Sequence, residues 1–172
     1  LPICPPGTGK TSYGLVNTLK EELLHDDTSV LLLSYTNRAI DEICSKLLEE
    51  SIDFIRIGNH TSCSREYHPF LLENKTASCR NVNALRQLIT STRVFVGTTT
   101  AFNSHTSLFS IKQFSLAIID EASQILEPHL RGILCASSNN KSAVSKFVMI
   151  GDHKQLPAVV QQNAETSKVD NP

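Results

Sequence analysis

The sequence of 172 residues contains no tryptophan and one methionine, and aromatic residues make up only 6% of it. It has no excess of either charge, because the formal net charge is −1. Proteins that attract nucleic acid through their overall field are strongly basic, so any such contact must come from a local groove. No apolar run reaches the roughly 18 residues of a membrane span, and no signal-like segment opens the chain. We therefore expect no membrane partner.

Paired cysteines are also lacking, because the five cysteines are scattered and form no C-x-x-C motif. This pattern favours reduced thiols in a cytoplasmic protein, or a nuclear one if the source is eukaryotic. His60, Cys63, His68 and Cys79 could be written as a zinc site. Their spacing matches no familiar zinc finger, so partly buried thiols and surface histidines are the preferred interpretation.

What is present is an alternation of short apolar runs with helical patterns. The runs are continuous rather than alternating, as in strands buried on both faces of a parallel sheet. They cover residues 29–35, 53–58, 93–100, 115–122 and 146–152. Apolar residues recur at helical spacing in 11–24, in 37–50, in 82–89 and after Pro128. This order predicts an α/β fold with a doubly wound, mostly parallel sheet, which binds ligands at the carboxyl ends of its strands.

We expect one domain over residues 1–172, with three segments outside the regular pattern. Residues 59–92 are interpreted as a short insertion, with little regular structure in 59–81. Residues 137–146 are expected to form a surface loop, and residues 162–172 a frayed tail. The chain begins with Leu1 rather than methionine, and only three residues precede Cys4, so we expect a piece of a longer protein.

The stretch CPPGTGKT (4–11) is close to a phosphate-binding loop. Gly7 and Gly9 allow consecutive amides to approach phosphate, Lys10 can reach the outer phosphates, and the Thr11 hydroxyl can bind magnesium. Cys4 stands where the pattern has its first glycine, and a small side chain is tolerable there if the position does not need positive φ. The alternative is a decayed loop that binds nothing.

Two further motifs follow apolar strands. In AIIDEAS (117–123), Asp120 is placed to hold magnesium and Glu121 to orient or deprotonate the attacking water. The alternative is an exposed pair that caps the next helix. In VMIGDHKQLPAVV (148–160), Gln155 can sense a γ-phosphate by hydrogen bonding, with Asp152 and Lys154 at the same edge. The alternative is a strand followed by a polar turn before Pro157, which explains Gly151 and Pro157 but not the cluster of polar residues.

Five segments in order give a more specific resemblance, namely CPPGTGKT, SYTNRAIDEIC, VGTTT, IIDEAS and GDHKQLPAVV. Together they resemble the first RecA-like domain of superfamily 1 helicases. The most similar branch is superfamily 1B, which includes the nonsense-mediated-decay and DNA-replication helicases. The resemblance covers nearly the whole chain, from the Walker A loop through motif III.

The resemblance implies a RecA-like P-loop NTPase domain that uses ATP and Mg²⁺. Its nucleotide-binding residues would be Pro6, Gly7, Thr8, Gly9, Lys10, Thr11, Asp120 and Gln155. Thr11 and Asp120 would hold magnesium. Glu121 would be the catalytic base, assisted by Lys10 and by Gln155 as the γ-phosphate sensor.

The resemblance also implies a track for single-stranded DNA or RNA. Thr36 and Asn37 in the second segment, and Thr98 and Thr99 in the third, would contact the sugar-phosphate backbone without reading bases. Helix capping is the alternative for these residues, and both roles can coexist. The second RecA-like domain, which completes the ATP site with arginines, is the expected partner. Since an arginine finger contributes about 10³–10⁵ in turnover, this chain alone should bind ATP but hydrolyse it poorly.

Two other classes of function are weighed against an ATP-dependent helicase. A GTPase switch normally carries Asn-Lys-x-Asp, but Asn74-Lys75 and Asn140-Lys141 are not followed by that aspartate. A vestigial, non-catalytic P-loop module is compatible with Cys4. It does not explain why Asp120, Glu121 and Gln155 are all present.

Overall fold

The computed structural model describes residues 10–138 and 141–151, with residues 10–13 and 138 described by their backbone only. These residues form an α/β fold around a five-stranded parallel sheet with the order β2-β3-β1-β4-β7. The strands are β1 (Val30–Ser34), β2 (Ile55–Ile57), β3 (Val94–Thr98), β4 (Phe114–Ile119) and β7 (Val144–Met149). The doubly wound parallel sheet expected from the sequence is confirmed.

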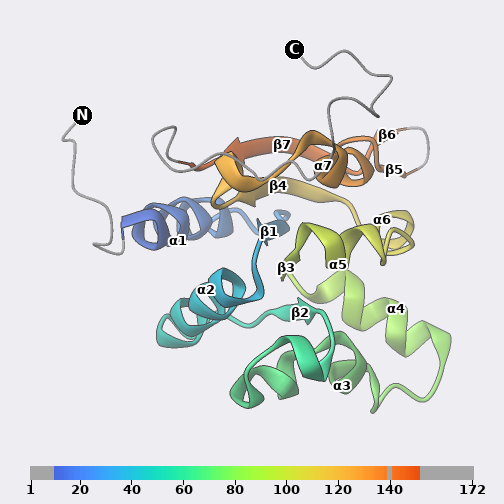
Figure 1. Ribbon diagram of the computed structural model, residues 1–172. Coiled ribbons are helices and arrows are strands. Elements are labelled where there is room, and N and C mark those ends of the chain that lie inside the picture. Colours follow the sequence, from blue (N-terminus) through green and yellow to red (C-terminus); the bar gives the residue numbers. More distant parts are fainter. Residues whose placement is uncertain (1–9, 139–140, 152–172) are drawn as a thin grey trace, which may run out of the picture.

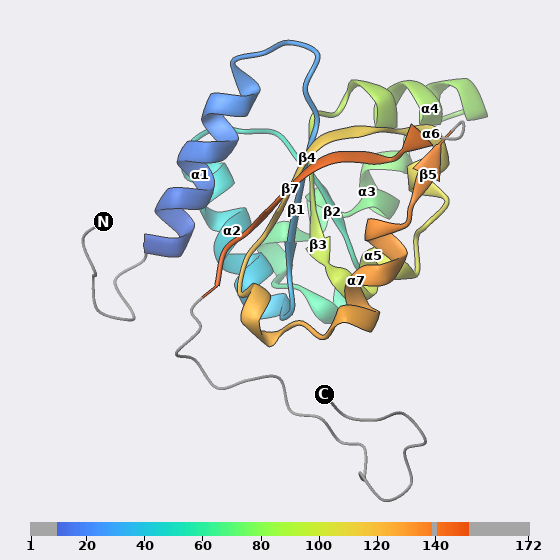
Figure 2. The same ribbon diagram turned by 90° about the horizontal axis from the view of Figure 1, so that it is seen from above.

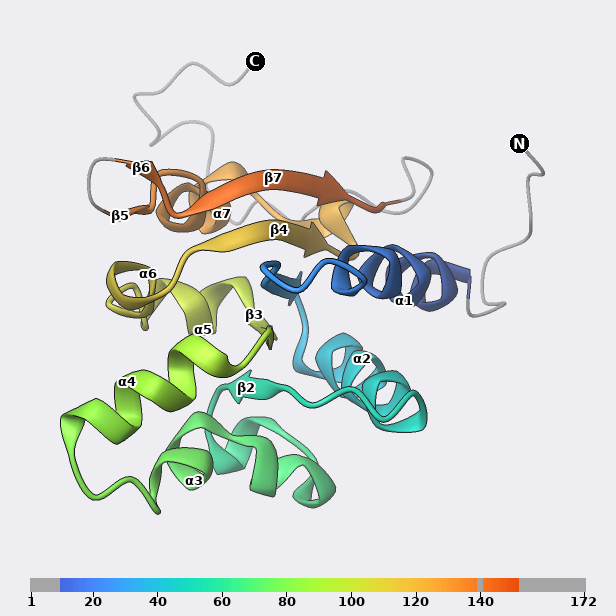
Figure 3. The same ribbon diagram turned by 180° about the vertical axis from the view of Figure 1, so that it is seen from behind.

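Helices cover both faces of this sheet. Helices α1 and α2 lie on one side of the strands, and α4, α5 and α6 lie on the other (Figures 1 and 3). The α-helices are α1 (Lys10–Leu23), α2 (Asn37–Glu49), α3 (Leu72–Thr76), α4 (Val82–Ser91), α5 (Thr99–Asn103), α6 (Leu108–Ile111) and α7 (Glu127–Leu134). None of the helices in the described ranges is long and apolar enough to cross a membrane.

The central strands β1, β3 and β4 are mostly buried because each face of the sheet packs against a different set of helices, whereas the edge strand β7 is largely exposed. Leu32 of β1 faces a core shared with Leu15 and Leu19 of α1 and with Ile40 of α2. Its neighbour Leu33 faces the opposite core, which contains phenylalanines from α5, α6 and the adjoining strands. All five residues of β1 are buried. Successive side chains of the strand therefore point alternately into two hydrophobic cores, rather than into one core and the solvent.

Because all five strands are parallel, their carboxyl ends meet at one edge of the sheet. The register places Ser34 opposite Thr98, and Leu33 opposite Ile119. Helix α1 begins on this same side of the molecule (Figure 2). The segments that follow β1, β3 and β4 are thus neighbours in space although they are far apart in the sequence.

The structure corrects two expectations about irregular segments. Residues 59–81 were expected to have little regular structure, but they contain two 3₁₀ helices, η1 (His60–Ser62) and η2 (Arg65–Phe70), and the short helix α3. Residues 137–146 were expected to be a loop, but they contain a small antiparallel pair, β5 (Ser137–Ser138) and β6 (Lys141–Ser142), and the start of β7. Both segments are polar, and polarity alone does not reveal local capping or strand pairing.

A candidate nucleotide and nucleic-acid site

The phosphate loop lies largely outside the described residues. Positions 1–9 are not described, so the predicted roles of Pro6, Gly7, Thr8 and Gly9 stay predictions. Lys10 and Thr11 form the first turn of α1, and their side chains are also outside the description. The helix therefore begins at the residue where the motif requires it, directly after the last glycine of the loop.

Asp120 follows β4 directly and is buried, with 7% of its surface exposed. Its backbone N–H donates to the carbonyl of Leu33 at 2.8 Å, which ties it to the end of β1. One carboxylate oxygen, Oδ1, accepts from the N–H of Glu121 at 2.9 Å. Burial raises the pKa of Asp120, the hydrogen bond from Glu121 opposes this shift, and the charge of Glu42 on α2 adds to it. This carboxylate is thus desolvated and lies in a negative field.

Glu121 adopts a left-handed backbone conformation, with φ 52° and ψ 36°. This region is uncommon for residues other than glycine, and such strain often marks a functional position. The pKa of Glu121 is raised by burial, and further by the carboxylates of Asp120 and Glu42, whereas the nearby Ser34 hydroxyl opposes the shift. A raised pKa brings a carboxylate closer to the range in which it can accept a proton from water.

The acidic pair has the character of an incomplete cation site. Within residues 14–137 and 141–151, no lysine or arginine forms an ion pair with Asp120 or Glu121. Two carboxylates without a positive partner, in a partly buried position, fit a hard divalent ion with oxygen ligands such as Mg²⁺. Asp120 would hold that ion together with the Thr11 hydroxyl, and the ion would neutralise phosphate charge when bound.

The four residues expected on the track occupy the same carboxyl edge. Thr36 caps α2, and its side chain accepts from Ala39 N–H at 3.2 Å, while Asn37 is exposed as the first helical residue. Thr98 caps α5 and accepts from Ala101 N–H at 3.1 Å. Thr99 is fully buried, and its hydroxyl has no hydrogen-bond partner among the described residues. Capping is therefore a role of both Thr36 and Thr98, and strand contact stays a prediction.

Strand β7 brings the start of the segment VMIGDHKQLPAVV, as far as Gly151, to this edge. Ala122 N–H donates to the carbonyl of Ile150 at 2.9 Å, so the turn after Asp120 is bonded to the end of β7. A Cβ added to Gly151 would lie 3.0 Å from the backbone nitrogen of Ser123, so the two segments are in close contact. Asp152, Lys154 and Gln155 follow and lie outside the described residues.

The histidines of the insertion contact Glu73 and each other, and Cys63 and Cys79 are free thiols. His60 Nε2 lies 2.9 Å from Glu73 Oε1, and its ring packs edge-on against the ring of His68 at 4.4 Å. In the described part of the chain, no group of three or more histidine, cysteine or acidic side chains could hold a metal ion. His60 and His68 thus pack against each other within the insertion, and His60 also contacts Glu73.

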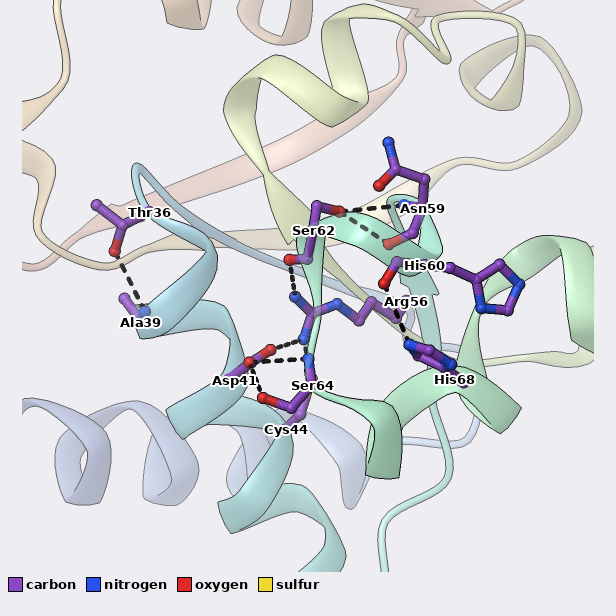
Figure 4. Close-up of polar contacts among 10 residues, drawn as sticks. All are labelled: Thr36, Ala39, Asp41, Cys44, Arg56, Asn59, His60, Ser62, Ser64 and His68. Atoms are coloured by element: carbon purple, nitrogen blue, oxygen red, sulfur yellow. Dashed lines mark hydrogen bonds and ion pairs between the residues drawn. The ribbon is translucent and has the colours of Figure 1, made fainter.

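Sequence reasoning missed a polar cluster around Arg56 of β2 (Figure 4). This arginine is only 1% exposed, and it forms an ion pair with Asp41 of α2. It also donates to the carbonyl of Ser62 at 3.2 Å and to Cys44 Sγ at 3.7 Å. An arginine between the apolar residues of FIRI (54–57) was the signal that could have found it.

Comparison with known proteins adds a family relationship. The sequence model of a family described as "AAA domain" matches residues 3–94 and 73–163. Proteins named DNA replication ATP-dependent helicase/nuclease DNA2 are 38% identical over 90% of this chain in Bos taurus, and 35% identical over 91% in Xenopus laevis. The Saccharomyces cerevisiae protein of that name is 34% identical over 92% of the chain. The chain spans 14% of the Bos taurus and Xenopus laevis proteins and 10% of the yeast protein.

Among solved structures, the helicase domain of Hef from Pyrococcus furiosus is similar in fold. The TM-score is 0.56 at 11% sequence identity, and the similarity covers 84% of this chain and 26% of that chain. At this level of identity the likeness supports the RecA-like fold alone.

Proposed function

Because this chain belongs to the AAA domain family and is related to DNA replication ATP-dependent helicase/nucleases, we propose that it is the ATP-binding motor domain of a superfamily 1B helicase or translocase. Its ligands are ATP and Mg²⁺ on one part of the carboxyl edge and a single strand on the other. The relatives' name favours DNA over RNA as the strand.

One observation supports the proposal, namely that the described part of the expected site, the acidic pair with Thr36 and Thr98, lies at one edge of the sheet. The acidic pair after β4 lies beside the ends of β1 and β7, and Thr98 of β3 lies opposite Ser34 of β1. Helix α1, which begins at Lys10, starts on this side (Figure 2). In open α/β sheets, ligands bind at the carboxyl ends of the strands, so this is where a nucleotide is expected.

Each residue has a defined role in the proposed chemistry. Residues 6–11 hold the triphosphate, with Lys10 on its outer phosphates and Thr11 and Asp120 on the magnesium ion. Glu121 accepts the proton of the attacking water, which its raised pKa favours. Gln155 donates to the γ-phosphate and reports its loss to the neighbouring strand contacts.

The complete reaction requires a second RecA-like domain. Arginines from that domain would stabilise the charge that develops on the transferred phosphate, a contribution of about 10³–10⁵ in turnover. We therefore expect this chain alone to bind Mg²⁺-ATP and to hydrolyse it very slowly. Closure of the two domains on ATP, and opening after hydrolysis, would move the strand.

Thermal unfolding with and without nucleotide tests the nucleotide site. At a tenfold excess of Mg²⁺-ATP over its Kd, mass action predicts a rise of about 3–6 °C in Tm for a chain of this length. Lys10→Ala should remove most of that rise and leave the Tm without nucleotide unchanged. An unmodified chain that shows no rise at millimolar Mg²⁺-ATP would contradict the proposal and favour a vestigial loop.

A further inference from the structure

A fifth segment, the one that follows β2, reaches the carboxyl edge, and the proposed function does not yet use it. Residues 58–64, here termed the β2 loop, follow β2, which pairs in parallel with β3. The register places Ile57 opposite Gly97, so the β2 loop leaves the sheet next to Thr98. It is therefore adjacent to the proposed track on the side away from the acidic pair.

Hydrogen bonds within the β2 loop hold its backbone in one conformation. Asn59 Oδ1 accepts from the N–H of Thr61 at 3.1 Å and from its hydroxyl at 2.8 Å. The Ser62 hydroxyl accepts from Asn59 N–H at 3.2 Å and donates to the Asn59 carbonyl at 3.0 Å. These reciprocal bonds form a capping box, which fixes the loop before any ligand arrives.

Two residues outside the β2 loop fix its position relative to α2 (Figure 4). Arg56 holds the Ser62 carbonyl with one nitrogen and forms the ion pair with Asp41 through another. Asp41 Oδ2 accepts from Ser64 N–H at 3.2 Å and from the Ser64 hydroxyl at 2.7 Å. The loop is thus held against the same helix whose N-terminal end carries Thr36 and Asn37.

The Arg56–Asp41 pair is expensive for a purely structural device. Arg56 Nε is buried and has no hydrogen-bond partner among the described residues. The Arg56 side chain is 1% exposed and that of Asp41 is 22% exposed, and an ion pair with a buried partner generally adds no more stability than well-packed apolar side chains, because the buried charge loses its hydration. What such a pair supplies is a defined direction and spacing between the segments that it joins.

The exposed side of the β2 loop has the chemistry of a phosphate-contacting segment. Asn59, His60 and Thr61 are exposed, as is the neighbouring Arg65. No acidic residue occurs between positions 58 and 65, and the carboxylates that flank this side are Glu73, which lies 2.9 Å from His60 Nε2, and the exposed Glu66 after Arg65. Amide, hydroxyl and guanidinium groups are the side chains that contact sugar and phosphate without reading bases.

We propose that the β2 loop is a third contact for the sugar-phosphate backbone of the single strand, and that Arg56 and Asp41 are positioning residues that hold it in register with α2. This inference rests on the proposed function, because it extends the track of that site. Preorganisation lowers the entropic cost of binding, so the positioning residues contribute to strand affinity without touching the strand.

Binding of a fluorescein-labelled oligothymidine, followed by anisotropy at low ionic strength, tests the loop directly. Thr61→Glu places a negative charge beside the phosphates and should weaken binding about fivefold, the factor that corresponds to roughly 1 kcal/mol of repulsion. Thr90→Glu is the matched control, because Thr90 is exposed near the C-terminal end of α4, at the opposite edge of the sheet. It should bind the strand as the unmodified chain does.

The double variant Arg56→Met/Asp41→Leu tests positioning separately from stability. Removing both charges together also removes the bonds to Ser62 and Ser64, so Tm should fall only modestly, whereas strand affinity measured well below Tm should fall about two- to tenfold. The rise in Tm with Mg²⁺-ATP should stay as in the unmodified chain.

Three results would overturn the inference. Equal strand binding by Thr61→Glu and the unmodified chain would remove the loop from the track, and a stable double variant with full strand affinity would remove the positioning role. An unmodified chain that binds no oligothymidine would overturn strand binding in the proposed function and this inference with it. The nucleotide-dependent rise in Tm distinguishes that last case from loss of the ATP site.

Discussion

Asp120 and Glu121 lie in an environment that disfavours their ionised form, which is the form that would bind Mg²⁺ or accept a proton. Both carboxyl groups have a raised pKa, chiefly because burial removes hydration and because each lies near other carboxylates. Folding with both groups ionised therefore costs free energy in the absence of a cation. Such a cost is typical of functional residues, where a strained or desolvated arrangement is kept for its activity.

This cost leads to a prediction for Asp120→Asn. The amide can keep the hydrogen bond from Glu121 N–H while it removes a buried charge. Thermal unfolding at pH 7 without nucleotide should therefore occur at a Tm raised by about 2–4 °C, and the rise with Mg²⁺-ATP should shrink. Asp26→Asn, on an exposed residue, is the control and should change neither value. A lower Tm for Asp120→Asn would show that the carboxylate stabilises the fold.

Only some residues of the candidate site could be predicted from the sequence. Asp120 and Glu121 could be placed because an acidic pair directly after an apolar strand is typical of the magnesium site in phosphate-loop enzymes. The field of Glu42 on this pair could not be predicted, because it depends on how α2 lies against the sheet. The ion pair of Arg56 with Asp41 was hidden for the same reason, since 15 residues separate the partners along the chain.

At the scale of elements, β2, β3 and α5 meet at a point where there is no room for a side chain. A Cβ on Gly97 would lie 2.8 Å from the Ile57 carbonyl oxygen and 2.9 Å from Cε2 of Phe102. Both distances are shorter than a normal contact, and both partners belong to packed elements. The glycine therefore sets how closely β2 and α5 approach β3, and with it the spacing of the Thr98 and β2 loop contacts.

Gly97→Ala should accordingly destabilise the fold by about 1–3 kcal/mol, the usual cost of overpacking a well-packed core. Urea unfolding at 25 °C measures this change. Gly14→Ala makes the same substitution in α1, where nothing lies within 4 Å of the added Cβ. That variant should gain about 0.5–1 kcal/mol from helix propensity. A neutral Gly97→Ala would show that β2 or α5 can move away at little cost.

The elements themselves were largely predictable from apolar periodicity. All five strands of the parallel sheet and the helices α1, α2, α4 and α7 follow runs or spacings visible in the sequence. The short helices α5 and α6 were missed, because four or five residues are too few to show a helical period. Helix α5 depends instead on a cap, the Thr98 hydroxyl, which the segment VGTTT contains without distinguishing it from a strand end.

At the scale of the whole molecule, buried titratable groups change the free energy of unfolding in opposite directions as pH rises. Burial, and then the charge of Arg93, lower the pKa of Lys112 to about 8, although its Nζ donates to the Thr90 carbonyl at 2.8 Å. Burial raises the pKa of Cys44 and of Tyr67 to about 12 each. Above about pH 9 for Cys44 and about pH 10 for Tyr67, these groups hold protons in the folded state that they would lose on unfolding, so their contribution to the free energy of unfolding falls as pH rises.

Lys112 acts in the opposite direction, and a matched variant isolates its effect. Between about pH 8 and the ordinary lysine value of 10.5, the unfolded chain binds a proton that the folded chain lacks. Its contribution to the free energy of unfolding therefore rises across this window and is lost as pH falls towards 8.

Lys112→Met keeps an unbranched apolar stem and removes the titration. Subtracting the free energy of unfolding of this variant in urea from that of the unmodified chain should leave a difference that increases from pH 8 to 10.5, with the contributions of Cys44 and Tyr67 cancelled. A flat difference would mean that Lys112 stays protonated, and that its bond to Thr90 and its position 5.7 Å from the Phe95 ring offset the loss of hydration.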